Sequence, residues 1–177
     1  MEQVITHSLD LGLLGFLRAG PKHGYAIHQE LSDPAGLGQV WQIKLSQLYA
    51  MLGKLEEAGF ISASTVTQEN KPPRKLFHLR EEGRSAFLSW VESPVNDGRS
   101  LRLEFLIKLY FARLEGTDVA ARLLVFQRER CQDWLAKELD LVREENEHHR
   151  MYSGLVHQFR SGQIRAMLAW LDSCEEE

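Results

Sequence analysis

The sequence predicts a mainly α-helical protein with one short β-hairpin in its N-terminal half. Apolar residues recur at helical spacing through most of its 177 residues. One stretch, residues 61–67, is instead β-branched and alternating, and a second alternating stretch follows after two prolines. The C-terminal half contains only helical patterns. These observations predict a mixed N-terminal domain followed by a helical one.

The composition is that of an ordinary globular protein, with 44% hydrophobic and 26% charged residues. No apolar run approaches the roughly 20 residues that span a bilayer, and the N-terminus has no basic, hydrophobic leader. We therefore expect a cytoplasmic protein without a membrane partner. Cys131 and Cys174 lack the spacing of metal ligands, so we expect free thiols and no cofactor.

Three helical segments are expected before the hairpin. The first ends at Gly20 and Pro21, and a loop at 33–39 follows the second. The third runs from Leu45 to a stop at Gly59, a residue that tolerates the left-handed conformation. The expected core residues are Leu9, Leu13, Phe16 and Leu17 in the first segment, Tyr25, Ile27 and Leu31 in the second, and Leu45, Leu48, Leu52 and Leu55 in the third.

The expected hairpin joins residues 61–67 to residues 75–79. Proline cannot donate to a sheet, so Pro72 and Pro73 are placed in the connecting loop. A very short strand is also expected at Trp41 and Ile43, and a helix at 80–93. The order helix, helix, short strand, helix, strand, strand, helix is that of a winged helix-turn-helix, in which the third helix enters the DNA major groove and the hairpin forms a wing.

The C-terminal half is expected to form helices at 101–114, 118–149 and 151–172. The middle one is long and amphipathic, with no intramolecular partner of equal length apparent in the sequence, which favours packing against another chain. The predicted organisation is therefore a winged helix-turn-helix DNA-binding domain at 1–93, a linker at 94–100 and a helical dimerisation domain at 101–177.

Three motifs in order resemble one known family. They are HGYAIHQEL, LSQLYAMLGKLEEAGFI and KPPRKLFHLREEGRSAF, and together they span residues 23 to 87. This chain closely resembles the PadR family of transcriptional regulators, and its C-terminal half is similar to the longer subgroup with a virulence-activator-like domain. The resemblance implies a homodimer that regulates transcription on double-stranded DNA, and we expect a repressor acting on a palindromic operator.

Two groups of side chains are candidates for DNA contact. On the third helix, the resemblance implies a role for Tyr49, and Ser46 and Gln47 are suited to hydrogen bonds with base edges or phosphates. Family members usually begin this helix with Ser or Thr, whereas Lys44 stands near that start, so the cap must come from Ser46 or another residue. The candidate phosphate ligands are Lys44 and Lys54 of the helix and Lys71, Arg74 and Lys75 of the wing.

The charge balance argues against a strongly basic footprint. Residues 1–93 contain 9 Lys and Arg against 10 Asp and Glu, and the whole chain has a formal net charge of −4. Phosphate binding requires local cations. The alternative hypothesis is therefore a winged-helix module for protein interaction or effector sensing, with weak affinity for DNA.

The sequence offers candidates for two further sites. In related regulators an apolar space between the winged domain and the dimer helices accepts small, often aromatic effectors, and Trp90, Phe105 and Trp134 are the candidates here; ordinary core packing is the alternative. His148 and His149 follow glutamates at i−4, but no third ligand is visible, so we expect no metal site. No nucleophile and base are paired, and we expect no enzyme.

Overall fold

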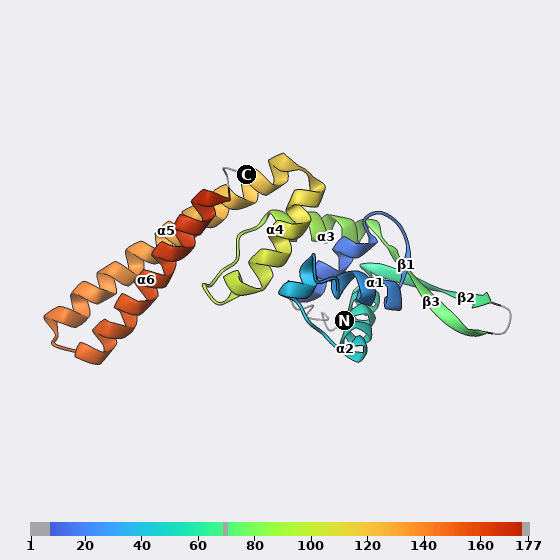
Figure 1. Cartoon of the computed structure of the whole chain (residues 1–177), viewed down its shortest axis with the longest axis horizontal. Helices are drawn as coiled ribbons and strands as arrows, with labels where there is room; N and C mark the ends of the chain where they lie inside the picture. The colour runs from blue at the N-terminus through green and yellow to red at the C-terminus, as the bar shows by residue number, and fades with distance from the viewer. Residues whose placement is uncertain (1–7, 69–70, 175–177) are drawn as a thin grey trace.

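The molecule is elongated, with a β-hairpin projecting from one end of a helical centre and a helical hairpin from the other (Figure 1). The structure is a computed structural model that describes residues 8–68 and 71–174, without the side chains of residues 67, 68, 71 and 72. None of the helices in these ranges is long and apolar enough to cross a membrane.

The N-terminal helices follow the order that the sequence predicts. They are η1 (Ser8–Leu17, a 3-10 helix), α1 (Gly24–Leu31), the 3-10 turn η2 (Leu37–Gln39), α2 (Leu45–Glu57) and α3 (Glu81–Glu92). Three leucines of α2 are fully buried: Leu48, Leu52 and Leu55. Because they recur on one side of the helix, the opposite side of α2 is left to solvent.

Two local predictions in this region are wrong. Tyr25, expected in the core, is 54% exposed, while Ile27 and Leu31 are buried as predicted. Residues 41–43 form no strand. Trp41 instead packs in the core, so close to η1 that a Cβ on Gly12 would lie 3.2 Å from its ring. A two-residue apolar alternation does not determine whether a partner strand is available.

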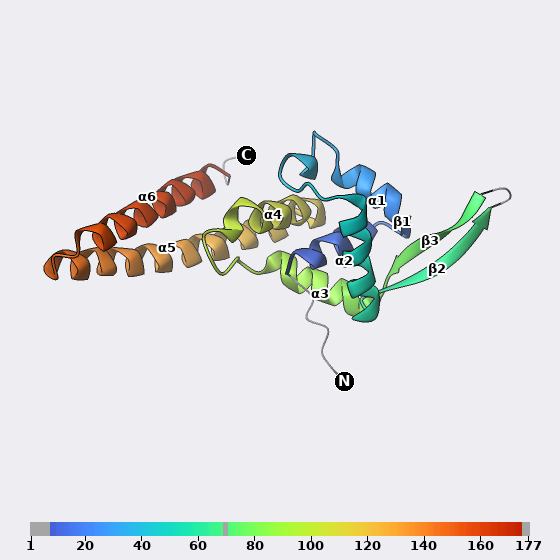
Figure 2. The same cartoon turned by 90° about the horizontal axis from the view of Figure 1, so that it is seen from below.

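The sheet has three antiparallel strands in the order β1-β3-β2. Their bounds are Lys22–His23 for β1, Ile61–Gln68 for β2 and Lys71–Leu79 for β3. The predicted hairpin of β2 and β3 is confirmed, and it forms the wing that projects in Figure 2. Strand β1 was missed because its two residues carry no alternation.

The two prolines lie inside β3, so their placement in the loop is wrong. Val66 pairs with Arg74 and Gln68 with Lys71, and the register shifts between these pairs. No Cα partner of Pro72 or Pro73 appears in this register. At such an irregularity the missing proline N–H removes no regular ladder bond, which is where a strand tolerates proline.

Helix α3 rests on the turn between α2 and β2. Gly59 has the positive φ of +77° that its predicted role as helix stop requires. The Arg80 amide donates to the Phe60 carbonyl across 3.0 Å. A Cβ on Gly83 would lie only 2.1 Å from that same carbonyl oxygen, so the absence of a side chain allows α3 to approach the turn.

The C-terminal half begins with the 3-10 turn η3 (Ser100–Arg102) and α4 (Glu104–Glu115). Helix α4 packs against the winged part, since the Phe111 ring meets Phe16 edge-on at 5.3 Å and Phe87 at 5.6 Å. A domain boundary at 94–100 stays a prediction, and α4, on its C-terminal side, shares the core of η1 and α3.

Helices α5 (Thr117–Glu147) and α6 (Met151–Ser173) form an antiparallel hairpin (Figures 1 and 2). Ion pairs link them along their length, among them Arg128 with Asp172 at 2.9 Å and His157 with Glu138 at 2.6 Å. The expectation that α5 has no intramolecular partner is therefore wrong. The sequence concealed this because α6 follows after only a three-residue turn and its own pattern is weakly amphipathic.

Candidate nucleic-acid interface

Helix α2 presents a shallow, mostly small-residue face to solvent. Ser46 and Gln47 are exposed, and Tyr49 is 42% exposed. Further along the same face, a Cβ built on Gly53 has no neighbour within 4 Å. Since Leu48, Leu52 and Leu55 anchor the opposite side, this face is rigidly held and open to a close-fitting partner.

The start of α2 is capped by its own third residue. The Lys44 backbone N–H donates to the Gln47 side-chain oxygen at 2.9 Å. This bond satisfies one of the amides left free at a helix start, and it supplies the cap that was expected from Ser46 or another residue. It also fixes the Gln47 amide, because its oxygen is engaged and its NH₂ group remains available as a donor.

Tyr49 connects α2 to the beginning of α1. A Cβ on Gly24 would lie 2.7 Å from the Tyr49 ring, so only glycine leaves room for the tyrosine there. The contact explains why a His-Gly-Tyr motif at α1 accompanies a tyrosine on α2. The next residue, Tyr25, exposes its own ring beside this contact.

The cations of the wing differ in their surroundings. Arg74 is exposed and has no ion pair with any residue in the described ranges. Lys75 is also exposed, but its ammonium lies 3.1 Å from a Glu56 carboxylate oxygen. The side chain of Lys71 lies outside the described part of the structure. His23 ties the base of the wing to β1, since its Nδ1 lies 2.8 Å from the Lys75 carbonyl oxygen.

The two lysines of α2 are also in unlike environments. Lys44 is exposed at the start of the helix, whereas the Lys54 ammonium lies 3.9 Å from the buried carboxylate of Asp10. Lys54 therefore compensates a buried charge of η1 and is a weaker phosphate ligand than its exposure suggests. Among the described cations of this surface, Lys44 and Arg74 are the two without an acidic partner.

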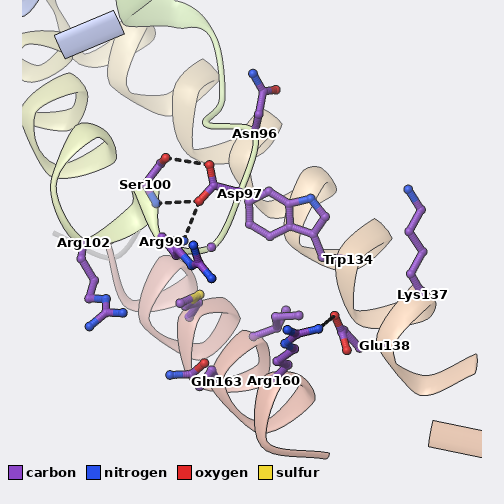
Figure 3. A pocket seen from close by; sticks show the side chains of 13 residues that line it. Asn96, Asp97, Arg99, Ser100, Arg102, Trp134, Lys137, Glu138, Arg160 and Gln163 are labelled. Atoms are coloured by element: carbon purple, nitrogen blue, oxygen red, sulfur yellow. Dashed lines mark hydrogen bonds and ion pairs between the residues drawn. The ribbon is translucent and has the colours of Figure 1, made fainter. Parts of the chain in front are cut away.

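The structure does not bring the three predicted effector residues into one cavity. The Trp90 indole N–H donates to Ser8 Oγ at 2.8 Å, and Phe105 is fully buried with its ring 6.0 Å from that of Trp170. Trp134 instead lines a cavity of about 730 Å³ between residues 96–102, α5 and α6 (Figure 3).

Lys108 is a buried cation beside Trp90. Its ammonium donates to the Ser93 carbonyl at 2.9 Å and lies 3.2 Å from Glu104 and 5.1 Å from the Trp90 ring centroid. Burial lowers the pKa of Lys108, and the Glu104 carboxylate opposes that shift. Every polar contact of this lysine comes from the protein itself, which is the arrangement of a structural residue.

No chemistry of the catalytic kind is apparent in the part of the molecule that the structure describes. Burial raises the pKa of the Cys131 thiol, which disfavours the reactive thiolate. Within the described ranges, no three His, Cys, Asp or Glu side chains are close enough to hold a metal ion. The exposed groups of α2 and the wing offer hydrogen bonds and positive charge only.

Helix α1, helix α2 and the hairpin that follows thus define a winged helix-turn-helix, the class of fold in which one helix and a wing face DNA. Residues 13–89 match the model of the transcriptional regulator PadR-like family. The chain belongs to this family. The family and the curated relatives are transcriptional regulators and not enzymes.

Two curated relatives resemble the chain. The Bacillus subtilis negative transcriptional regulator PadR is 33% identical over 115 residues, which cover 63% of this chain and 62% of that protein. A probable transcriptional regulator of Mycobacterium tuberculosis is 27% identical over 63 residues, covering 36% of this chain and 33% of that protein. The matched parts are thus less than two thirds of either relative.

Solved structures of Bacillus subtilis PadR are similar as well. The complex with operator DNA covers 95% of this chain and 97% of that one at 25% identity, with a TM-score of 0.49. The complex with p-coumaric acid covers 96% and 94% at 23% identity, with a TM-score of 0.42. The fold assignment of this chain rests on its own elements and on the family match.

Sequence reasoning missed the acidic partners of the predicted cations and the exposure of Tyr25. Glu56 and Lys75 are far apart in the sequence, and only the packing of α2 against the sheet brings them together. Asp10 gave one signal, since an acidic residue within an apolar helical stretch needs a cation nearby when it is buried. The spacing of Tyr25 gave no such warning.

Proposed function

We propose that this chain is a homodimeric repressor that binds a palindromic operator, with α2 in the major groove and the wing on the phosphate backbone. The observation that carries the proposal is the exposed face of α2, where Ser46, Gln47 and Tyr49 stand together beside the cationic wing. Repression is supported by the relative named as a negative regulator. Such a protein would act in the cytoplasm, on the chromosome.

The contacts are expected to divide by chemistry. The free NH₂ group of Gln47 suits an acceptor on a base edge, because its oxygen already caps α2. Arg74 and Lys44 suit phosphates, since neither has an acidic partner among the described residues. Lys75 would contribute once it leaves Glu56, and Lys71 is proposed on its sequence position alone. Lys54 would contribute least.

The dimer is proposed to form through the outer face of α6. Three large apolar side chains there are strongly exposed: Tyr152 at 82%, Leu155 at 60% and Phe159 at 66%. The small residues Gly162 and Ala166 continue the line at spacings of three and four. This is the spacing by which helices pack as coiled coils, and two α5–α6 hairpins joined along it would form a four-helix bundle.

Dimerisation also answers the weak charge of the winged part. A monomer offers few unpaired cations, whereas a two-fold dimer presents two wings and two α2 helices about 34 Å apart, one turn of DNA. Such symmetry matches a palindromic site. Release by a small aromatic or hydrophobic effector is part of the proposal, with the cavity beside Trp134 as its site.

A gel shift with the DNA upstream of the protein's own gene, at moderate salt, tests the proposal. The expected result is a discrete complex that resists competition by random DNA, with a dimer on each site. Equal competition by specific and random DNA would favour the alternative function, a winged-helix module for protein interaction or effector sensing. The pairing of Lys75 and Lys54 with acids is the observation behind that alternative.

A further inference from the structure

The cavity beside Trp134 has walls from three separate segments. The loop and turn at 96–102 form one wall, α5 contributes Trp134, and α6 contributes Ile164 and Met167 (Figure 3). Its volume of about 730 Å³ lies within the range of small-molecule sites. The indole, the isoleucine and the methionine supply an apolar surface on which a flat ring can rest.

The polar lining of this cavity is dominated by positive charge. Arg99, Arg102, Lys137 and Arg160 line it, against the two acids Asp97 and Glu138. The lining therefore has a formal charge of +2, in the half of the chain where acidic residues outnumber basic ones by 15 to 12. A local excess of cations in an acidic region is suited to attract anions.

Both acids are occupied by the protein itself. Asp97 accepts bonds from the Arg99 and Ser100 amides at 2.9 and 3.1 Å and from the Ser100 hydroxyl at 2.9 Å. These bonds, the hydroxyl first, lower the pKa of Asp97, so it stays charged and keeps the turn in shape. Glu138 lies 2.6 Å from His157 Nδ1 and 3.9 Å from Arg160.

Two of the cations have no such partner. Arg102 and Lys137 make no ion pair with any residue that the structure describes, and they approach the cavity from opposite walls. Both side chains are long and are drawn around the same opening in Figure 3. An anion between them would gain two charged contacts at once, which a single surface lysine does not provide.

We propose that this cavity binds a small organic dianion with a flat ring, held by Arg102 and Lys137 at its charged groups and by Trp134 at its ring. Two negative charges would balance the formal charge of the lining. Arg99 is placed to assist, while Arg160 is shared with Glu138. A ring dicarboxylate and a nucleoside monophosphate both have this chemistry.

Binding would connect the two halves of the chain. The segment at 96–102 follows α3 directly, and the buried Val95 amide donates to Gln127 of α5 at 2.8 Å. A ligand held between Arg102 and Lys137 would add a second link between this segment and the α5–α6 hairpin. Any effect on DNA affinity rests on the proposed function, whereas binding itself is measured on the protein without DNA.

Calorimetry with a charge series tests the proposal. Benzyl alcohol, benzoate and isophthalate share one ring and have charges of 0, −1 and −2 at neutral pH. We expect isophthalate to bind at least tenfold more tightly than benzoate, and benzyl alcohol not to bind measurably. Adenosine 5′-monophosphate distinguishes the two sources of the dianion. If all three members of the series bind equally, or neither dianion binds, the proposal is overturned.

Variants locate the site. Lys137→Ala and Arg102→Ala should each weaken binding of the preferred dianion about tenfold, and Trp134→Leu should remove the quenching of indole fluorescence that the ligand causes. Arg165→Ala is the matched control, since it removes an exposed cation from α6 outside the cavity. Circular dichroism melting verifies that each variant is folded. Unchanged affinity in the folded Lys137 and Arg102 variants would contradict the site.

The DNA experiment is kept separate. Wild-type protein saturated with the dianion is compared with free protein in the gel shift. If the dianion binds but DNA affinity does not change, the cavity stands and its role as effector site fails. If neither state of the protein selects DNA, the proposed function fails while the binding data remain valid.

Discussion

The winged part and the α5–α6 hairpin handle their apolar side chains in opposite ways. In the winged part and α4, large side chains such as Leu48, Phe87 and Phe111 are at most 2% exposed. In the hairpin, Tyr152 is 82% and Phe159 is 66% exposed. The winged part is therefore complete within one chain, whereas the hairpin buries one face inside the chain and leaves another for a partner.

The largest expected effect comes from a charge on the hairpin's open face. Phe159→Glu should weaken the dimer by about 4 kcal/mol, because symmetry places the altered residue twice in the interface and an interface anchor contributes about 2 kcal/mol. The monomer should stay folded, since Phe159 contributes little to its core. Sedimentation equilibrium measures the dissociation constant.

Gln158→Glu is the matched control for this variant. It adds the same charge to the next position of α6, on an exposed side chain away from the line of Tyr152, Leu155 and Phe159. Its dimer should dissociate at close to the wild-type concentration. If both variants behave as the wild type does, the open face of α6 is not the interface and the contrast between the two regions disappears.

A glycine substitution probes the completeness of the winged part. Gly83→Ala should lower the free energy of unfolding by about 3 kcal/mol, because its Cβ would stand 2.1 Å from the Phe60 carbonyl oxygen. Gly53→Ala, in open space on α2, should instead stabilise by about 0.5–1 kcal/mol through helix propensity. Urea denaturation measures both, and equal effects would mean that α3 can move away from the turn.

The wing provides a smaller effect. Arg74→Ala with Lys75→Ala should reduce the salt dependence of DNA binding by about two units, roughly 0.9 for each phosphate that the wing no longer neutralises. Glu56→Gln should strengthen binding several-fold, since it frees Lys75 from the carboxylate 3.1 Å away. Affinity titrations over a range of salt concentrations measure both. An unchanged slope in the double variant would remove the wing from the interface.

The smallest expected effect concerns Lys108, where the two regions meet. Its pKa is lowered by burial, so above that pKa the native state binds fewer protons than the unfolded state. Stability from this residue is therefore least below the lowered pKa and rises with pH until the ordinary value of 10.5 is reached. The difference in unfolding free energy between wild type and Lys108→Met, followed from pH 8 to 11, should show this rise. A difference that stays constant with pH would exclude it.

Much of the fold could be predicted from spacing alone. The leucine line of α2, the stop at Gly59 and the alternation at 61–67 each depend on neighbours within a few residues, and each is present as expected. The predictions that failed depend on distant partners. Trp41 packs on η1 instead of forming a strand, and α6 covers the inner face of α5.

The candidate site divides along the same line. The sequence by itself determined that α2 has an exposed face with Ser46, Gln47 and Tyr49, because helical periodicity places them opposite the leucines. Only the tertiary structure decided which cations are unpaired, since Glu56 and Asp10 reach Lys75 and Lys54 through packing. Charge acts through space and periodicity acts along the chain. For that reason the cavity between Arg102 and Lys137 became apparent only when the chain was folded.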